Sequence, residues 1–159
     1  MPDPESPTWL TPTAYQKLQQ ELEYLTAGRR KQLQARLAEA RAHGDFRENA
    51  DYEAAKDEQG MVEARIRQLR RLLETAEVRR VGDTGAVEIG CLVSVLDEGE
   101  EREFFVAPPE NKIPGYVLAT PGSPLGRVLL GARAGDTVSY EAPGGIYTLT
   151  ITSVRPFEE

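Results

Sequence analysis

The sequence predicts an α+β protein in which an N-terminal antiparallel α-helical coiled-coil hairpin precedes a small, mostly antiparallel β-sheet domain with one short helix. Two long stretches carry apolar residues at alternating three- and four-residue steps, which is the spacing of a coiled-coil seam. After residue 78, short β-rich runs separated by Gly and Pro replace that pattern. We therefore divide the 159 residues into a hairpin over 1–80, with an acidic tip at 43–52, and a second domain over 81–159.

The first helix is predicted to begin at Pro12 with Thr11 as its N-cap, because Thr favours the cap and Pro the first helical position. Each arm of the hairpin has about 30 residues and would span about 45 Å. Gly28 and Gly60 are expected to be tolerated defects in the shafts. The two apolar stripes comprise Tyr15, Leu18, Leu22, Leu25, Leu33, Leu37 and Ala40, and then Ala55, Val62, Ile66, Leu69, Leu73 and Ala76, with Gln59 as the one interruption.

The second domain is predicted from four β-rich runs bounded by Pro- and Gly-containing turns, at 92–96, 103–106, 137–140 and 147–151. A short helix is expected over Pro124–Ala132, with Ser123 as its N-cap and Pro124 at its first position. The segment Val81–Val87 contains two glycines and is predicted to be a linker.

Composition limits the class of protein. No apolar run approaches the roughly 20 residues that span a bilayer, and the acidic, Pro-rich N-terminus is unlike a signal peptide. The single cysteine, Cys91, is too few for an internal disulfide framework or a zinc cluster and is expected to be a core residue. We expect a reduced, cytoplasmic protein with no membrane partner, and a monomer because the hairpin satisfies its own seam.

The net charge of −7 is distributed unevenly. Residues 1–80 hold 14 basic and 14 acidic side chains, whereas residues 81–159 hold 5 basic and 12 acidic ones, so the second domain carries the whole excess. Arginines concentrate on the shafts of the hairpin. This pattern either favours different partners at the two ends of the chain or reflects arginines that solvate a coiled coil.

Two carboxylates, Asp45 and Glu48, lie where the chain must turn from one helix into the other. Their spacing is also that of a capping box, with Asp45 as N-cap and Glu48 at the third helical position. Gly44 is expected to supply a positive φ at the turn. Capping and chemistry are compatible, because a capped turn fixes where both carboxylates point.

Three stretches of the sequence form a recognisable set: Trp9-Leu10-Thr11 with Tyr15, Leu18, Glu21 and Leu22; the tip and second helix from His43 to Lys56 with Gln59-Gly60 and Glu63–Ile66; and Ser123–Gly131 with Gly135–Val138. Through them the sequence resembles the Gre family of bacterial transcript cleavage factors over about residues 9–155. The third stretch is similar to the FKBP-like C-terminal domain of that family. The resemblance implies a factor that inserts its coiled coil through the secondary channel of RNA polymerase and stimulates cleavage of the RNA in a backtracked complex.

In that family, residues at the positions of Asp45 and Glu48 help to hold a second Mg²⁺ in the polymerase active site and orient the attacking water. This is the two-metal arrangement for phosphodiester hydrolysis. Two carboxylates cannot complete the octahedral shell that Mg²⁺ requires, so the ion would be shared with the polymerase and not held stably by the free protein. The chain would then be no enzyme by itself, but a cofactor protein for the polymerase's own activity.

The resemblance also implies contacts away from the acidic pair. Side chains that would contact the nascent RNA 3′ segment or the polymerase near the tip are Arg41, Arg47, Asn49, Tyr52 and Lys56. The motif that would dock on the rim of the channel consists of Ser123, Pro124, Leu125 and Gly126. Two departures from the family pattern are the loop Pro108–Gly115 and Asp51, which stands where Glu is commoner.

Three functional interpretations stay open on the sequence. The first is an active cleavage factor, and the second is a homologue that binds the same channel but inhibits or regulates transcription without cleavage. The third is a coiled-coil adaptor or a prolyl isomerase, since fold alone does not settle function. An isomerase would need an aromatic pocket in the second domain, whereas the only tryptophan, Trp9, is assigned to the hairpin.

Overall fold

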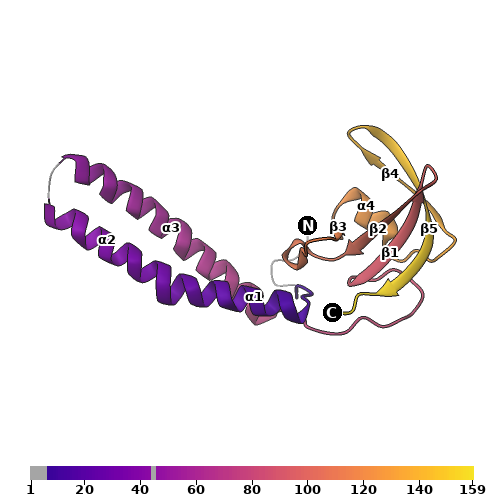
Figure 1. Ribbon diagram of the computed structural model, residues 1–159, viewed down its shortest axis with the longest axis horizontal. Helices are drawn as coiled ribbons and strands as arrows, with labels where there is room; N and C mark the ends of the chain where they lie inside the picture. The colour runs from indigo at the N-terminus through magenta and orange to yellow at the C-terminus, as the bar shows by residue number, and fades with distance from the viewer. Residues whose placement is uncertain (1–6, 44–45) are drawn as a thin grey trace. The chain divides into compact units, whose positions relative to one another are not determined.

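The computed structural model describes residues 7–43 and 46–159, and the side chains of residues 43–49 lie outside that description. The contacts divide the chain into two compact units. One contains Tyr15–Ala76 and is helical, and the other combines Thr8–Ala14 with Glu77–Glu159 and carries the sheet (Figure 1). The predicted α+β architecture, a helical hairpin followed by a sheet domain with a short helix, is confirmed.

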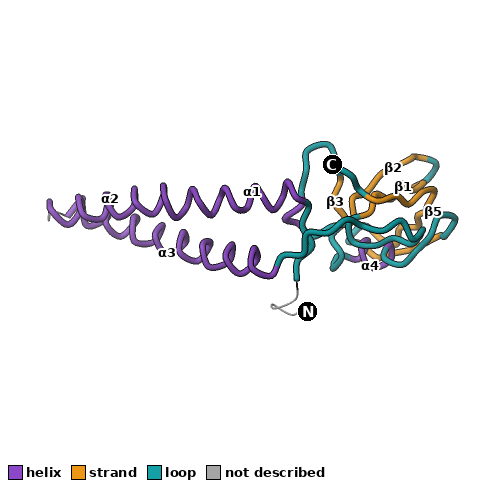
Figure 2. The backbone as a smooth tube through the Cα atoms, turned by 90° about the horizontal axis from the view of Figure 1, so that it is seen from below, coloured by secondary structure: helices purple, strands orange, loops and turns teal. Residues whose placement is uncertain are grey.

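Four helical segments build the hairpin. They are α1 (Pro12–Glu23), the π-helix η1 (Tyr24–Arg29), α2 (Arg30–His43) and the 30-residue α3 (Phe46–Thr75), which runs back beside the others (Figure 2). Thr11 Oγ1 accepts the backbone N–H of Ala14 at 3.0 Å, which confirms Thr11 as the N-cap of α1. In the described part of the chain, no helix is both long and apolar enough to cross a membrane.

The π-helix explains an irregular step in the apolar stripe. Leu33 follows Leu25 by eight residues, which is one more than the seven that keep two side chains on the same side of a regular coiled-coil helix. The N–H of Arg30 bonds to the C=O of Leu25, five residues back, so the π-helix absorbs the extra residue. Leu33 is consequently buried, at 1% exposure, in the same seam as Leu25.

The predicted seam is confirmed by burial. Leu33, Val62 and Ile66 form its central cluster, with Leu22 and Leu25 packed against them. Other buried seam residues are Leu18, Leu37, Ala40, Ala55 and Leu69. Gly60 lies within the uninterrupted α3 with open space around its Cα, so it is tolerated there as expected.

The second unit contains a five-stranded sheet in the order β3-β2-β1-β5-β4. Its strands are β1 (Cys91–Asp97), β2 (Glu100–Val106), β3 (Val117–Ala119), β4 (Thr137–Ala142) and β5 (Gly145–Pro156). All pairs are antiparallel except β2 with β3, and a register shift between Ser94 and Val95 marks a bulge in the pairing of β1 with β5. The three-residue strand β3 escaped prediction because it is too short to show an alternating pattern.

An aromatic cluster lies at the centre of this unit. Phe105 is fully buried, stacks on Phe157 at 4.5 Å between ring centroids, and meets the edge of Trp9 at 6.2 Å. Cys91 is buried in the same core, as predicted. The expected linker is more ordered than predicted, because Val81 and Val87 at its two ends are both core residues.

The short helix α4 (Pro124–Leu129) is capped by Ser123 as predicted, but it ends three residues before the expected Ala132. The reason lies just beyond Leu129, where the N–H of Gly131 bonds to the C=O of Val87 and the C=O of Ala132 accepts the N–H of Val87. These backbone bonds to another segment end the helix. A second short helical turn, the 3-10 helix η2 (Pro109–Asn111), lies in the loop that departs from the family pattern.

Candidate functional site at the hairpin tip

In the sequence, the acidic pair lies where α2 ends and α3 begins. The backbone of α2 ends at His43 and that of α3 begins at Phe46, so Glu48 occupies the third helical position that the capping box requires. Asp45 and the side chains of Arg47, Glu48 and Asn49 lie outside the described residues. The capping and metal-binding roles of Asp45 and Glu48, and the conformation of Gly44, therefore stay predictions.

Arg41 and Tyr52, two predicted contact residues, contact each other where the tip joins the two helices. Arg41 Nη2 donates to Tyr52 Oη at 3.1 Å, and the guanidinium carbon lies 5.5 Å from the centroid of the tyrosine ring. The hydrogen bond from Arg41 lowers the pKa of the Tyr52 phenol from its usual value, since the cation favours the phenolate. The pair joins α2 to α3 across the hairpin.

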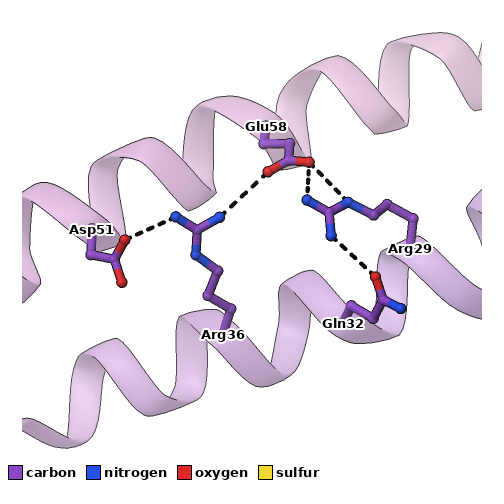
Figure 3. Close-up of polar contacts among 5 residues, drawn as sticks. All are labelled: Arg29, Gln32, Arg36, Asp51 and Glu58. Atoms are coloured by element: carbon purple, nitrogen blue, oxygen red, sulfur yellow. Dashed lines mark hydrogen bonds and ion pairs between the residues drawn. The ribbon is translucent and has the colours of Figure 1, made fainter.

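Next to this pair, an arginine that the sequence analysis did not single out forms a second connection (Figure 3). Arg36 Nη2 on α2 donates to Asp51 Oδ1 on α3 at 2.9 Å, and its Nη1 lies 3.5 Å from Glu58 Oε2. Glu58 also pairs with Arg29, which in turn donates to Gln32 Oε1 at 3.1 Å. Five side chains thus form a polar network along one side of the hairpin.

Several arginines on the shafts of the hairpin form ion pairs with glutamates of the facing helix. Besides Arg29, Arg30 makes a two-point contact with Glu63 at 2.8 and 2.9 Å, and Arg65 makes one with Glu21 at 2.7 and 2.9 Å. These arginines therefore neutralise acidic partners on the facing helix. At these positions the arginines form ion pairs within the coiled coil, which is more than the solvation of its surface that the sequence suggested.

Lys56, the remaining predicted tip residue with a described side chain, is exposed on α3. Its Nζ lies 3.5 Å from Gln59 Oε1, one turn farther along the same helix. Unlike Arg41, Lys56 bonds to its own helix, and among the described side chains its ammonium group has no hydrogen-bond partner on α2. This placement leaves it available to an anionic group approaching from outside.

In the second unit, most residues of the predicted docking motif make contacts within the fold. Ser123 Oγ accepts the N–H of Gly126 at 3.0 Å and donates to the C=O of Thr120 at 2.7 Å. A Cβ on the buried Gly126 would lie 1.9 Å from the carbonyl oxygen of Thr120, so only glycine fits. Leu125 packs against the core, and Pro124 is the exposed member of the motif.

The expectation that Trp9 belongs with the hairpin is wrong. Trp9 is 6% exposed in the core of the sheet unit, its Nε1–H donates to the C=O of Arg79 at 3.1 Å, and a β-bridge joins it to Glu77. Long-range contacts of this kind carry no local sequence signal. Because Trp9 lies in the sheet unit, its location no longer argues against an isomerase. A pocket of about 330 Å³ beside Trp9 and Phe157 is lined by apolar side chains and by charged ones of both signs.

The ion pair between Arg36 and Asp51 was not predicted from the sequence. Both lie at positions that face each other only after the turn has set the register of α2 against α3. The available signal was the presence of opposite charges at similar distances from the turn, a pattern that predicts interhelical pairs once the turn is located.

Comparisons with known proteins identify the family. Residues 8–78 match the family described as "Transcription elongation factor, N-terminal", and residues 82–156 match "Transcription elongation factor, GreA/GreB, C-term". Transcription elongation factor GreA of Streptomyces coelicolor is 44% identical over 145 residues, covering 89% of this chain and 88% of the relative. GreA of Streptomyces avermitilis is 40% identical over 159 residues, covering 97% and 96%.

The chain is also similar in sequence to a protein of solved structure. GreA factor homolog 1 (Gfh1) of Thermus thermophilus is 29% identical, covers 94% of this chain and 99% of its own, and superposes with a TM-score of 0.45, too low to carry an argument. The two matched regions follow the same order as the hairpin and the sheet. The chain therefore belongs to the GreA/GreB family of transcription elongation factors.

Proposed function

We propose that the chain binds RNA polymerase, inserts its helical hairpin into the secondary channel and stimulates the polymerase to cleave backtracked nascent RNA, which rescues arrested complexes. The observation that carries the proposal is the position of Asp45 and Glu48 in a chain of this family, at the turn between α2 and α3. A 30-residue helix such as α3 rises about 45 Å, so the turn is the part of the unit that can reach deepest into a narrow opening.

The donor set of the tip fits a shared magnesium ion. At neutral pH exposed Asp and Glu side chains are ionised, and carboxylate oxygens are the ligands that Mg²⁺ prefers. Two of them leave the octahedral shell incomplete, so Asp45 and Glu48 would hold the ion together with groups of the polymerase. Bound there, Mg²⁺ supplies charge neutralisation and a lowered pKa for a bound water.

The chain's own residues would bind and orient. Asp45 and Glu48 accept hydrogen bonds from the attacking water and hold it in line with the scissile phosphate. Arg47, Asn49 and Lys56 are proposed to contact the RNA 3′ segment or the polymerase, where cationic side chains suit phosphates. Arg41 and Tyr52 stand apart from that set because they contact each other. By itself the chain would cleave no RNA.

Docking of the second unit on the rim of the channel is proposed to involve the motif Ser123 to Gly126. Because Ser123 and Gly126 are engaged within the fold, the exposed Pro124 and the neighbouring exposed Arg127 are the side chains available to a partner. The hairpin buries its own seam, which favours a monomeric factor. A factor that acts on RNA polymerase would work in the cytoplasm.

The test is transcript cleavage by a defined, halted and backtracked elongation complex in the presence of Mg²⁺. Wild type is compared with Asp45→Asn and Glu48→Gln, and with Asp57→Asn as a matched control that removes an exposed carboxylate farther along α3. We expect cleavage by wild type and Asp57→Asn, and a loss of about 10² or more in both tip variants while polymerase binding persists.

Other outcomes would change the assignment. Binding without cleavage by wild type would replace the proposal with the regulatory alternative, a channel-binding factor that inhibits or regulates transcription. If wild type neither binds the polymerase nor stimulates cleavage, the proposal that RNA polymerase is the partner fails. In that case Asp45 and Glu48 would serve only as a helix cap.

A further inference from the structure

Over the side chains that the structure describes, the buried apolar seam of the hairpin extends toward the tip as far as Ala40 and Ala55. Among the described side chains, the last buried ones on the tip side are Ala40 on α2 and Ala55 on α3, which each contribute one methyl group. Residues 41–42 and 50–54 include no buried side chain. Since apolar contact is what holds paired helices together elsewhere in the hairpin, the last turns before the tip need another means of fixing their position.

Two polar pairs occupy this region, Arg36 with Asp51 at 2.9 Å and Arg41 with Tyr52 at 3.1 Å. We refer to them as the tip pairs. Asp51 and Tyr52 are consecutive residues, so their side chains leave α3 about 100° apart around the helix axis. Two arginines of α2 therefore hold the same turn of α3 from two directions.

The first tip pair continues into the body of the hairpin (Figure 3). Arg36 reaches Glu58 at 3.5 Å, and Glu58 pairs with Arg29 at the end of the π-helix. Polar contacts thus connect Asp51, near the tip end of α3, to Arg29 at the end of the π-helix. Such a network fixes how far α3 is shifted along α2, and this register determines where the turn lies.

The magnitudes of two effects indicate what the tip pairs do. Exposed ion pairs contribute little to folding free energy, because water screens them and their long side chains lose entropy. By contrast, a displacement of about 1 Å in a catalytic group can lower a rate by about 10². The tip pairs are therefore suited to control geometry rather than stability.

We propose that Arg36–Asp51 and Arg41–Tyr52 are positioning pairs that set where the tip presents Asp45 and Glu48, and that Arg41 acts through Tyr52 rather than by binding an RNA phosphate. This inference rests on the proposed cleavage function. It also gives the family departure at Asp51 a local role, since this carboxylate is the partner of Arg36.

Double-mutant cycles on transcript cleavage test the proposal. The variants are Arg41→Ala, Tyr52→Ala and their combination, then Arg36→Gln, Asp51→Asn and their combination. The maximal rate and the factor concentration at half-maximal rate are measured separately. We expect each single change to lower the maximal rate about two- to fivefold with the half-maximal concentration unchanged, because an exposed pair can shift the tip's geometry only by the small free energy it contributes. Each double variant should lose no more than its singles. Arg67→Ala, which removes an exposed arginine of α3, is the matched control and should leave both values unchanged.

A direct phosphate contact by Arg41 predicts a different result. The losses from Arg41→Ala and Tyr52→Ala would then add, and Arg41→Ala would make binding to the backtracked complex less dependent on salt. Tyr52→Phe refines the comparison, because it keeps the ring beneath the guanidinium but removes the hydroxyl. A positioning pair predicts an intermediate maximal rate for this variant.

Amide hydrogen exchange in the free protein separates this inference from the cleavage function. Each single variant should accelerate exchange at residues 50–54 and leave residues 62–66 in the centre of the seam unchanged. If wild type fails to cleave but exchange responds in this way, the pairs still position the tip and only the cleavage function fails. Unchanged exchange in the variants would overturn the positioning role whether or not wild type cleaves.

Discussion

Asn111 and Thr11, 100 residues apart, are joined by a buried hydrogen bond in which Asn111 Oδ1 accepts the backbone N–H of Thr11 at 2.8 Å. The Nδ2 group of Asn111 donates to the C=O of Trp9 at 2.9 Å and to the C=O of Pro108 at 3.1 Å. With 1% of its surface exposed, Asn111 has its polar atoms fully engaged. Its amide ties residues 9–11 into the sheet unit.

This arrangement predicts that Asn111→Ala destabilises the sheet unit by about 2–4 kcal/mol, because it leaves the N–H of Thr11 and the C=O of Trp9 buried without partners. Chemical denaturation followed by the fluorescence of Trp9, the single tryptophan, measures the change. Lys112→Ala, an exposed neighbour, is the control and should stay within about 0.5 kcal/mol of wild type. Equal stability of Asn111→Ala and wild type would contradict the anchoring role.

The parts of the fold that could be predicted are those encoded by neighbouring residues. The N-caps Thr11 and Ser123 were predicted because side-chain capping depends on only three or four positions. The helical seam followed from periodicity, and four of the strands followed from β-rich runs bounded by Gly- and Pro-containing turns. Trp9 and Asn111 could not be placed, since their partners lie about 100 residues away and no local pattern records them.

The same distinction applies to the site. A contiguous motif at a predicted turn identified Asp45 and Glu48, whose side-chain arrangement stays a prediction. Arg36 was overlooked because its contact with Asp51 depends on the register of two helices, and the π-helix shifts that register by one residue. Composition could only indicate that arginines are abundant on the shafts, not which of them pair.

Gly126 is predicted to be a packing residue. Replacing it by alanine would place a Cβ 1.9 Å from the carbonyl oxygen of Thr120, which forces α4 away from the preceding loop. Overpacking of this kind costs about 1–3 kcal/mol. Thermal unfolding compares Gly126→Ala with Gly122→Ala, whose added methyl would meet no atom within 4 Å. Similar melting temperatures for the two variants would show that the loop yields easily.

Cys91 is predicted to be unreactive in the folded protein. Burial raises the pKa of its thiol, so the nucleophilic thiolate is scarce at neutral pH, and 1% exposure keeps reagents away. An aromatic disulfide reagent should modify it only as fast as the protein unfolds, and promptly in denaturant. Rapid, stoichiometric modification under native conditions would contradict the described burial.

The ion pair between Arg30 and Glu63 predicts a specific response of the hairpin to acid. The hydrogen bond from Arg30 lowers the pKa of Glu63 below its usual value of 4.5, with further attraction from Arg30, Arg67 and Arg70. A lowered pKa in the folded state means that the stabilisation is fully present above the usual value and is lost as pH falls through the lowered one.

Glu63→Gln should therefore matter little near pH 3, where wild type has begun to lose the same interaction, and should destabilise the hairpin slightly at pH 7. The effect is small because both side chains are partly exposed. Amide exchange within α3 at the two pH values measures it, and Glu74→Gln, an exposed carboxylate of the same helix, is the matched control. A Glu63→Gln effect of equal size at pH 3 and pH 7 would show that Glu63 stabilises the hairpin through packing of its aliphatic stem, since that contribution does not depend on its charge.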